Sequence, residues 1–300
     1  MRTSAIQCAL GAQEGLEQLL VQLRLTEPSA TCSFLDAVIV SLDLEVSRRC
    51  RQAILDSKKY QPKIREVRIA SIDTRHIFNT AAGGLPRKRQ IRTQQYSTLN
   101  ASKDFEDCDV TDFKECEFSE TVRIAAEQVN HVITNAVRIQ EHDSTGEKMA
   151  DTRNFRKVII VGQSIDGDLA VLKRIGLNLY KEKTVVAILD TYTLGRKILT
   201  RERATGGYSL AGMLTVLGCP YGPHELHNAG NDATYTLRAT LMLAAVWGDE
   251  QESLGEATAH HERLRSFAFA EANSLDRWIP VRGSLWPYAD EIQVGEGEEF

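Results

Sequence analysis

The sequence predicts an α/β fold in which helices flank a mixed five-stranded sheet. Two observations lead to this class. Three strand-like segments follow one another in the first part of the chain, which suits an antiparallel meander. Strands then alternate with helices, which is typical of βαβ units with parallel strands. Hydrophobic residues make up 42% of the 300 residues, enough to form the core of such a fold.

The first three strands are predicted at 34–46, 66–73 and 93–99. The first is an apolar run rich in Val, Ile and Leu, the pattern of a central strand buried on both faces. The second alternates polar and apolar side chains, as a partly exposed strand does. A basic and then acidic insertion at about 80–118 surrounds the third strand.

The next part begins with apolar residues at helical spacing, which predict a helix at 119–140. Ser209 and Asn228 are expected to cap two later helices at their N-termini. Gly176 and Gly218 are expected to end helices in the left-handed conformation. The elements predicted in this part are strand 157–161, helix 167–174, strand 184–189, and helices 209–217 and 228–247.

We expect the chain to divide into three parts, namely an N-terminal helical extension at 1–29, the α/β domain at 30–250 and a C-terminal extension at 251–300. Leucines at helical spacing over 12–24 predict an amphipathic helix in the first part. Two interpretations of the C-terminal extension stay open, since it could pack against the domain or bind a protein partner.

Charge and cysteine content exclude several classes. The formal net charge is −5 at pH 7, so a nucleic-acid partner has to be argued from local features. The six cysteines form no CxxC pair, which disfavours a zinc site or a disulfide framework. No apolar run approaches the roughly 20 residues of a membrane-spanning helix, and the first residues lack the apolar core of a secretory signal. We therefore expect no membrane segment and an intracellular location, cytoplasmic or nuclear.

Two acids, Asp43 and Glu45, come near the end of the first predicted strand. Side chains on a strand alternate between the two faces, so these acids point the same way. Like charges that are buried together are costly unless a partner or a cation offsets them. Taken alone, the pair also suits a strand that ends at Leu42, with both acids in solvent.

A third acid, Asp168, follows the strand at 157–161, after the chain turns at Gly162. It is expected in the first turn of the next helix, near the C-terminal edge of the sheet. Taken alone, it is explained by the helix dipole, which favours an acid there, with Asp166 as the N-cap. Either aspartate could be the functional one, and the spacing favours Asp168.

The last candidates are His227 and Asp232. Asp232 is expected one turn inside the helix that begins at Asn228, on its inward side with Ala229 and Thr236. His227 falls on the loop before this helix. A lone loop histidine is usually a surface residue, but its offset of five residues from a partly buried aspartate makes it a candidate for catalysis.

Together these segments resemble the three exonuclease motifs of the DEDDh family, in the family's order. The first motif is Asp43-Leu44-Glu45, and the segment 162–168 (Gly-Gln-Ser-Ile-Asp-Gly-Asp) resembles Gly-His-Asn-x-x-x-Asp. The segment 227–232 (His-Asn-Ala-Gly-Asn-Asp) matches His-x-Ala-x-x-Asp. The resemblance covers about 34–247, and the long insertion is similar to that of a fungal branch. Gln163 departs from the pattern, since many members have histidine there; that position supports the site and does not hold metal.

The resemblance implies a ribonuclease H-like fold and a 3′-to-5′ exonuclease that acts on a single-stranded end of RNA or DNA. The catalytic residues that it implies are Asp43, Glu45, Asp168, His227 and Asp232. The four carboxylates would hold two Mg²⁺ or Mn²⁺ ions, because hard oxygen ligands select such cations.

The expected mechanism assigns a role to each of these residues. Asp43, Glu45 and Asp232 would hold the ion that binds the nucleophilic water. Asp43 and Asp168 would hold the ion that stabilises the leaving oxygen. His227 would accept the proton of the water, since imidazole titrates near neutral pH.

Two other interpretations stay open. A catalytically inactive nucleic-acid-binding or scaffold protein on the same fold would show no affinity for divalent cations. An endonuclease on the same fold would cleave a circular single strand. The sequence does not choose between RNA and DNA, because no motif reports recognition of the 2′-hydroxyl group.

Basic and aromatic residues near the expected site are candidates for substrate contacts. The segment 87–89 (Arg-Lys-Arg), with Arg92, suits a phosphate contact, a nuclear-import patch or a solvated loop. Tyr192 and Tyr208 could stack on bases or pack in the core. Further candidates for phosphate contacts, which are also ordinary surface charges, are Lys173, Arg174, Arg196, Lys197, Arg201 and Arg203.

Overall fold

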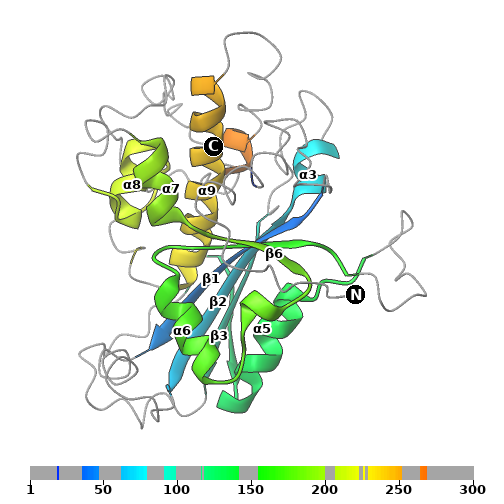
Figure 1. Ribbon diagram of the computed structural model, residues 1–300. Helices are drawn as coiled ribbons and strands as arrows, with labels where there is room; N and C mark the ends of the chain where they lie inside the picture. The colour runs from blue at the N-terminus through cyan, green and yellow to red at the C-terminus, as the bar shows by residue number, and fades with distance from the viewer. Residues whose placement is uncertain are drawn as a thin grey trace, which may run out of the picture.

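The computed structural model describes residues 19, 36–46, 62–79, 91–98, 116, 118–141, 155–199, 207–222, 226, 229–251 and 264–268. Within these ranges, six strands form one mixed sheet, and helices cover both of its faces (Figure 1). The α/β class expected from the sequence is confirmed. In spatial order, the strands are β4 (Thr121–Ile124), β3 (Arg92–Thr98), β2 (Ile64–Asp73), β1 (Val38–Val46), β5 (Val158–Gly162) and β6 (Val185–Asp190).

The strand pairing follows the predicted division into a meander and parallel units. β2 runs antiparallel to both β1 and β3, whereas β5 runs parallel to both β1 and β6. Ser41 of β1 is level with Val161 of β5, and Gly162 of β5 is level with Asp190 of β6. The C-terminal ends of these three strands therefore meet at one edge of the sheet, the edge at which open α/β sheets bind ligands.

The sixth strand, β4, replaces the start of the helix predicted at 119–140. Thr121, Val122 and Ile124 are β-branched, and β4 pairs in parallel with β3. Val122 is 51% exposed, so its side chain is not part of a buried helical stripe. The helical part begins only afterwards, with the 3-10 turn η1 (Ala126–Gln128) and the helix α5 (Val129–Val137). The predicted apolar period therefore runs across a strand and a helix, and the sheet has one strand more than expected.

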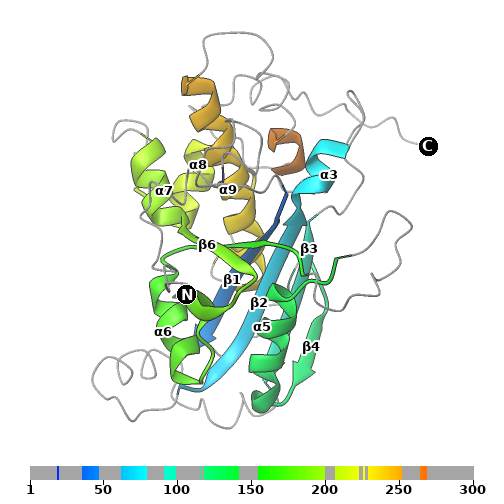
Figure 2. The ribbon, with the colours of Figure 1, turned by 45° about the vertical axis from the view of Figure 1, so that its right-hand side comes forward.

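Helices lie on both faces of the sheet. α5 and α6 (Asp166–Arg174) cover one face, and the long α9 (Ala229–Gln251) crosses the other (Figure 2). Leu42 and Leu44 of β1 belong to the core beneath α5 and α6, whereas Ile39 belongs to the core beneath α9. Because side chains alternate along a strand, Asp43 and Glu45 face the same side as Ile39, toward α9.

The helix ends agree with the sequence in part. The Oγ atom of Ser209 accepts a hydrogen bond from the backbone N–H of Gly212 at 3.2 Å, and so caps α8 (Leu210–Val216) as predicted. Gly176 and Gly218 have φ angles of 93° and 66°, which confirms the left-handed helix ends. The helices that the sequence analysis did not predict include α3 (Thr74–Asn79) and α7 (Thr191–Ile198).

The start of α6 differs from the prediction. The helix begins at Asp166, and its N-cap residue is Ile165, which makes no side-chain capping bond. The expectation that Asp166 caps this helix is therefore wrong. Asp166 and Asp168 both lie in the first turn, where the partial positive charge of the helix N-terminus favours acids.

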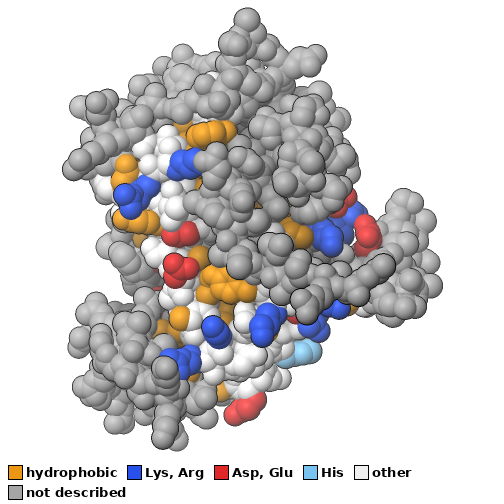
Figure 3. Space-filling view, viewed as in Figure 1, with side chains coloured by type: hydrophobic (Ala, Val, Ile, Leu, Met, Phe, Trp, Pro, Cys, Tyr) orange, Lys and Arg blue, Asp and Glu red, His pale blue; other side chains and the backbone are white. Residues whose placement is uncertain are grey.

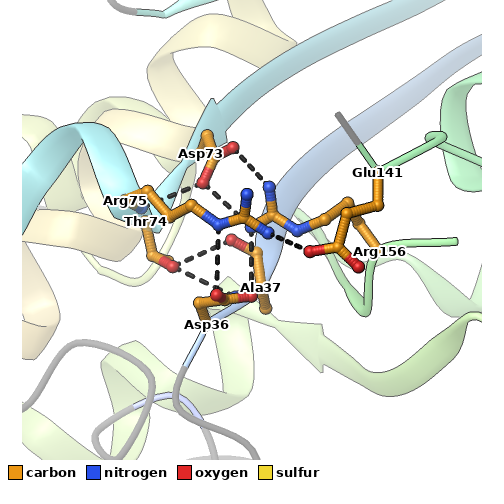
Figure 4. Close-up of polar contacts among 7 residues, drawn as sticks. All are labelled: Asp36, Ala37, Asp73, Thr74, Arg75, Glu141 and Arg156. Carbon is orange, nitrogen blue, oxygen red and sulfur yellow. Dashed lines mark hydrogen bonds and ion pairs between the residues drawn. The ribbon is translucent and has the colours of Figure 1, made fainter. Parts of the chain in front are cut away.

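A cluster of ion pairs lies at the edge of the sheet opposite to Asp43 (Figure 4). Arg156 is buried and donates to both carboxylate oxygens of Asp73, at 2.6 and 3.0 Å, and to Asp36 at 3.2 Å. Arg75 continues the cluster, because it donates to Asp36 at 3.1 Å and to Glu141 at 2.7 Å. These bonds join the start of β1, the end of β2 and the segment before β5, so they hold the strand ends in register.

Several predictions lie outside the described residues. They are the N-terminal helix at 12–24 apart from the buried, helical Leu19, most of the insertion at 80–118, the cap Asn228, and most of the extension at 251–300. Among the helices that the structure describes, none has the length and apolar character needed to cross a membrane.

Candidate active site

The two acids of β1 lie near the edge of the sheet where β1, β5 and β6 end. Asp43 and Glu45 are half-buried, and the apolar residues that alternate with them are buried. Ser41 is level with Val161 in the parallel register, so Asp43 lies level with the turn that follows β5. The alternative in which the strand ends at Leu42 is excluded, because β1 continues beyond both acids.

Asp168 approaches the same edge from α6. It is 6% exposed, whereas Asp166 is an exposed residue. The chain turns sharply before this helix: a Cβ atom on Gly162 would lie 2.7 Å from side-chain atoms of Ile165, so a glycine is needed there. Of the two aspartates in this turn, Asp168 is the one that the fold buries.

Asp232 comes from the first turn of α9 and is half-buried. Thr236, one turn further along, is 2% exposed, so this side of the helix faces inward. Asn231 and Ala233 on either side are 1% and 0% exposed. His227 lies outside the described residues.

The charges of these acids meet at Asp43. Burial is the largest cause that raises the pKa of Asp43 well above its ordinary value, followed by the charges of Asp168, Asp232 and Glu45. The Oδ2 atom of Asp43 is shielded from solvent and has no hydrogen-bond partner among the described residues. Three acids, two of them from distant segments of the chain, therefore lie within electrostatic reach of Asp43.

The chemistry of this group of acids suits a divalent cation. All four side chains offer oxygen ligands, which Mg²⁺ and Mn²⁺ prefer, and the buried Oδ2 of Asp43 is one of these oxygens. In the described ranges, no three or more His, Cys, Asp or Glu side chains are already arranged to hold a metal ion. The acids thus interact through their charges, and their side chains would have to move closer together to coordinate one ion.

Gln163, in the turn after β5, is tied to two other segments. Its Nε2 atom donates to the backbone oxygen of Tyr208 at 3.0 Å, and its Oε1 atom accepts from the hydroxyl of Thr191 at 2.5 Å. The backbone N–H of Ser164 donates to Asp190 at 2.7 Å. The two ends of the Gln163 amide therefore tie the turn after β5 to the start of α7 and to the segment before α8.

The sequence analysis missed a polar row beside the acids. Asp43 is level with Arg68 of β2, and Glu45 is level with Glu66. Arg68 is in turn level with Gln95 of β3. Glu66 and Arg68 are each 2% exposed, so the expectation of a partly exposed second strand is wrong at these positions. The signal in the sequence was the alternation of Glu66 and Arg68 with apolar residues. In the structure this polar face of β2 is buried next to Asp43 and does not face solvent.

The surface near this edge carries aromatic and basic side chains. Tyr192 is 38% exposed, meets Tyr208 edge-to-face with ring centroids 6.2 Å apart, and has the guanidinium carbon of Arg196 5.9 Å from its ring centroid. Figure 3 shows basic side chains over α7 and acidic side chains between α7 and α6. The other predicted phosphate contacts that the structure describes are Arg92, Lys173, Arg174 and Lys197; the segment 87–89, Arg201 and Arg203 lie outside the described residues.

Comparison with known proteins gives two findings. Residues 38–243 match a family profile of the DEDDh type, described as DNA polymerase III subunit epsilon-like, C-terminal domain. The uncharacterized protein YDR514C of Saccharomyces cerevisiae is 30% identical over 169 residues, a match that covers 49% of this chain and 33% of the relative. The chain thus spans about a third of the length of this curated relative. The profile match runs from the start of β1 into α9 and includes all four acids.

Proposed function

The chain belongs to the DEDDh family of DNA polymerase III subunit epsilon-like domains, and on this basis we propose that it is a metal-dependent 3′-to-5′ exonuclease acting on RNA or DNA. The observation that carries the proposal is the convergence of Glu45, Asp168 and Asp232 on Asp43, which raises the pKa of Asp43. Repulsion between these carboxylates destabilises the fold, and cations bound between them would offset it.

The four acids would hold the cations in the arrangement expected from the sequence. Asp43, Glu45 and Asp232 are the proposed ligands of one ion, and Asp43 and Asp168 those of the other. Bound Mg²⁺ or Mn²⁺ supplies Lewis-acid stabilisation of charge on the phosphodiester oxygens. The buried Oδ2 of Asp43, which has no hydrogen-bond partner in the described part of the chain, supports its place in both ligand sets.

His227 is the proposed general base. In the sequence it stands two positions before the first residue of α9 and five positions before Asp232. An imidazole near neutral pH can take a proton from the attacking water and release it later. Gln163 supports this arrangement by fixing the turn from which α6 and Asp168 start.

Tyr192 and Arg196 favour an unpaired strand as the substrate. An exposed tyrosine ring offers a face on which a base can stack, and stacking requires a base that is free of its own duplex. Arg196 beside this ring adds positive charge for the backbone phosphates. We therefore propose a single-stranded 3′ end as the preferred substrate.

The test is an assay of the purified full chain with Mg²⁺ on RNA and DNA oligonucleotides, single- and double-stranded, labelled at either end. A 3′-to-5′ exonuclease releases mononucleotides at once from a 3′ label and produces a descending ladder from a 5′ label. Asp232→Asn should abolish both signals, whereas Asp166→Asn, which changes an exposed acid of the same charge, should not. Cleavage of a circular single strand would instead select an endonuclease, and cleavage that survives Asp232→Asn would refute the site.

A non-catalytic nucleic-acid-binding protein on the same fold is the second candidate. The observation that favours it is Arg68, because a buried guanidinium beside Asp43 offsets carboxylate charge without any metal. This candidate predicts oligonucleotide binding with no hydrolysis and no Mg²⁺ or Mn²⁺ affinity. Calorimetric titration of the full chain with Mn²⁺ separates it from the exonuclease.

A further inference from the structure

Arg68 is the closest cross-strand neighbour of Asp43 on β2. The two residues are partners in the antiparallel register of β1 and β2, so their side chains leave the sheet on the same face. Arg68 is 2% exposed. A guanidinium at this depth is costly unless negative groups surround it, and the neighbouring acids of β1 supply them.

The guanidinium is anchored on one side only. One terminal nitrogen, Nη2, forms an ion pair with Glu66, which also accepts from Arg65 at 2.9 Å. The Nε and Nη1 atoms of Arg68 are buried and have no hydrogen-bond partner among the described residues. Glu66 therefore uses part of the donor capacity of Arg68 and leaves the rest of it uncommitted beside Asp43.

Arg68 interacts electrostatically with Asp43 and with the acids around it. Its positive charge lowers the pKa of Asp43 and opposes the three acids that raise it. Conversely, burial lowers the pKa of Arg68, whereas Glu66 and Asp43, followed by Cys116 and Glu45, raise it. Arginine keeps its proton at neutral pH even after a substantial shift, so this charge is fixed.

We propose that Arg68 is a positioning residue that acts as a built-in counter-cation for the carboxylate group, holding Asp43 in place in the metal-free protein and opposing divalent cations that bind there. The first half of this proposal concerns the protein alone, and the second half rests on the proposed exonuclease function. The ordinary alternative is that Arg68 and Glu66 form a structural pair that is indifferent to Asp43.

The first experiment is a double-mutant cycle in EDTA, with Asp43→Asn and Arg68→Met combined in the full chain and thermal unfolding as the readout. Asp43→Asn removes repulsion from three acids and also removes the attraction to Arg68. When Arg68 is already replaced by Met, Asp43→Asn removes only the repulsion. The rise in Tm caused by Asp43→Asn should therefore be roughly 4 °C larger in the Arg68→Met protein than in the unmodified protein. Equal shifts in both backgrounds would overturn the proposal.

Matched variants keep this experiment decisive. If Arg68→Met does not fold, the cycle is run on Glu66→Gln/Arg68→Met, in which the buried Glu66 no longer carries a charge that has lost its ion pair with Arg68. Arg68→Lys retains the positive charge, so Asp43→Asn should change the Tm of Arg68→Lys by about as much as it changes the Tm of the unmodified protein. Arg156→Met removes a buried arginine from the ion-pair cluster at the opposite edge of the sheet, and should lower the Tm without altering the response to Asp43→Asn. A change of the response in Arg156→Met would also contradict the proposal.

The second experiment measures Mn²⁺ affinity by calorimetry. Arg68→Met should bind Mn²⁺ about tenfold more tightly than the unmodified protein, because a like charge is removed at short range. Arg68→Lys and Arg156→Met should bind within about threefold of it. An unchanged affinity in a folded Arg68→Met would refute the opposing role. If no variant binds Mn²⁺ the exonuclease proposal fails, and the cycle in EDTA still decides whether Arg68 holds Asp43.

Discussion

Asp43 of β1 and Asp168 of α6 lie close enough that the charge of Asp168 is, after burial, the largest contribution that raises the pKa of Asp43. The fold brings these acids together although whole strands and insertions separate them along the chain. Mutual repulsion of buried carboxylates opposes folding, so relieving it should stabilise the protein while removing its chemistry.

Asp168→Asn tests this opposition directly. With one repelling charge removed, the Tm in EDTA should rise by roughly 2–4 °C, which corresponds to about 1 kcal/mol for a domain of this size. Exonuclease activity should fall by about 100-fold or more, because a proposed cation ligand is lost. The readouts are thermal unfolding and the initial rate of nucleotide release.

The matched control is Asp166→Asn, two positions earlier in the same helical turn. This residue is exposed and is not among the causes of the pKa shift of Asp43, so neither Tm nor activity should change appreciably. A drop in Tm for Asp168→Asn, or equal effects of the two substitutions, would contradict the electrostatic account.

His227→Ala should reduce kcat by about 10²- to 10⁴-fold and leave KM within about threefold, because only proton transfer is removed. The measurement is steady-state release of nucleotides from a single-stranded oligonucleotide over a range of concentrations. His131→Ala changes an exposed histidine of α5 that bonds only to Asn135 among the contacts described, and serves as the control. An unaltered kcat in His227→Ala would assign the base elsewhere.

Tyr192→Ala should weaken binding of single-stranded oligonucleotides by about 1–3 kcal/mol, the range for one lost base-stacking contact. Fluorescence anisotropy in EDTA measures binding without turnover. Tyr192→Phe should bind almost normally, since it keeps the ring. Val122→Ala, at the other exposed large hydrophobic residue of the described chain, should have no effect. Equal binding by Tyr192→Ala and the unmodified protein would show that Tyr192 does not contact the oligonucleotide.

Asp73 should make stability depend on pH at the opposite edge of the sheet. Burial acts to raise the pKa of Asp73, but the hydrogen bonds from Arg156 and from the backbone of Arg75 outweigh it, and the pKa lies below its ordinary value of 3.8. Its stabilising contribution is therefore complete at neutral pH and is lost as the pH falls from about 4 through the lowered pKa.

Urea unfolding of the unmodified protein and of Asp73→Asn at several pH values measures this contribution. The difference in the free energy of unfolding between the two proteins should be largest at pH 7 and shrink below pH 4. A difference that stays constant down to pH 3 would show that the charge of Asp73 does not contribute.

Much of this site follows from local sequence rules. Alternation along a strand places Asp43 and Glu45 on one face, and a glycine turn before a helix places Asp168 at the end of β5. These rules depend only on near neighbours in the chain. They therefore also correctly predicted the cap at Ser209.

The features that sequence reasoning missed depend on contacts between distant segments. Glu66 and Arg68 alternate with apolar residues as in a strand that faces solvent, and only the packing of α9 over the sheet makes that face buried. α7 contains Gly195, which lowers helix propensity. The structure uses this glycine for close packing, because a Cβ atom there would lie 2.5 Å from the sulfur of Met213.

Anomalous diffraction from crystals of the full chain soaked in Mn²⁺ examines the proposed metal site itself. We expect anomalous density in contact with the carboxylate of Asp43 and flanked by Glu45, Asp168 and Asp232, and we expect it to vanish in Asp43→Asn. Density elsewhere on the protein, or saturating Mn²⁺ with none beside Asp43, would contradict the proposal that these four acids form a metal-dependent nuclease site.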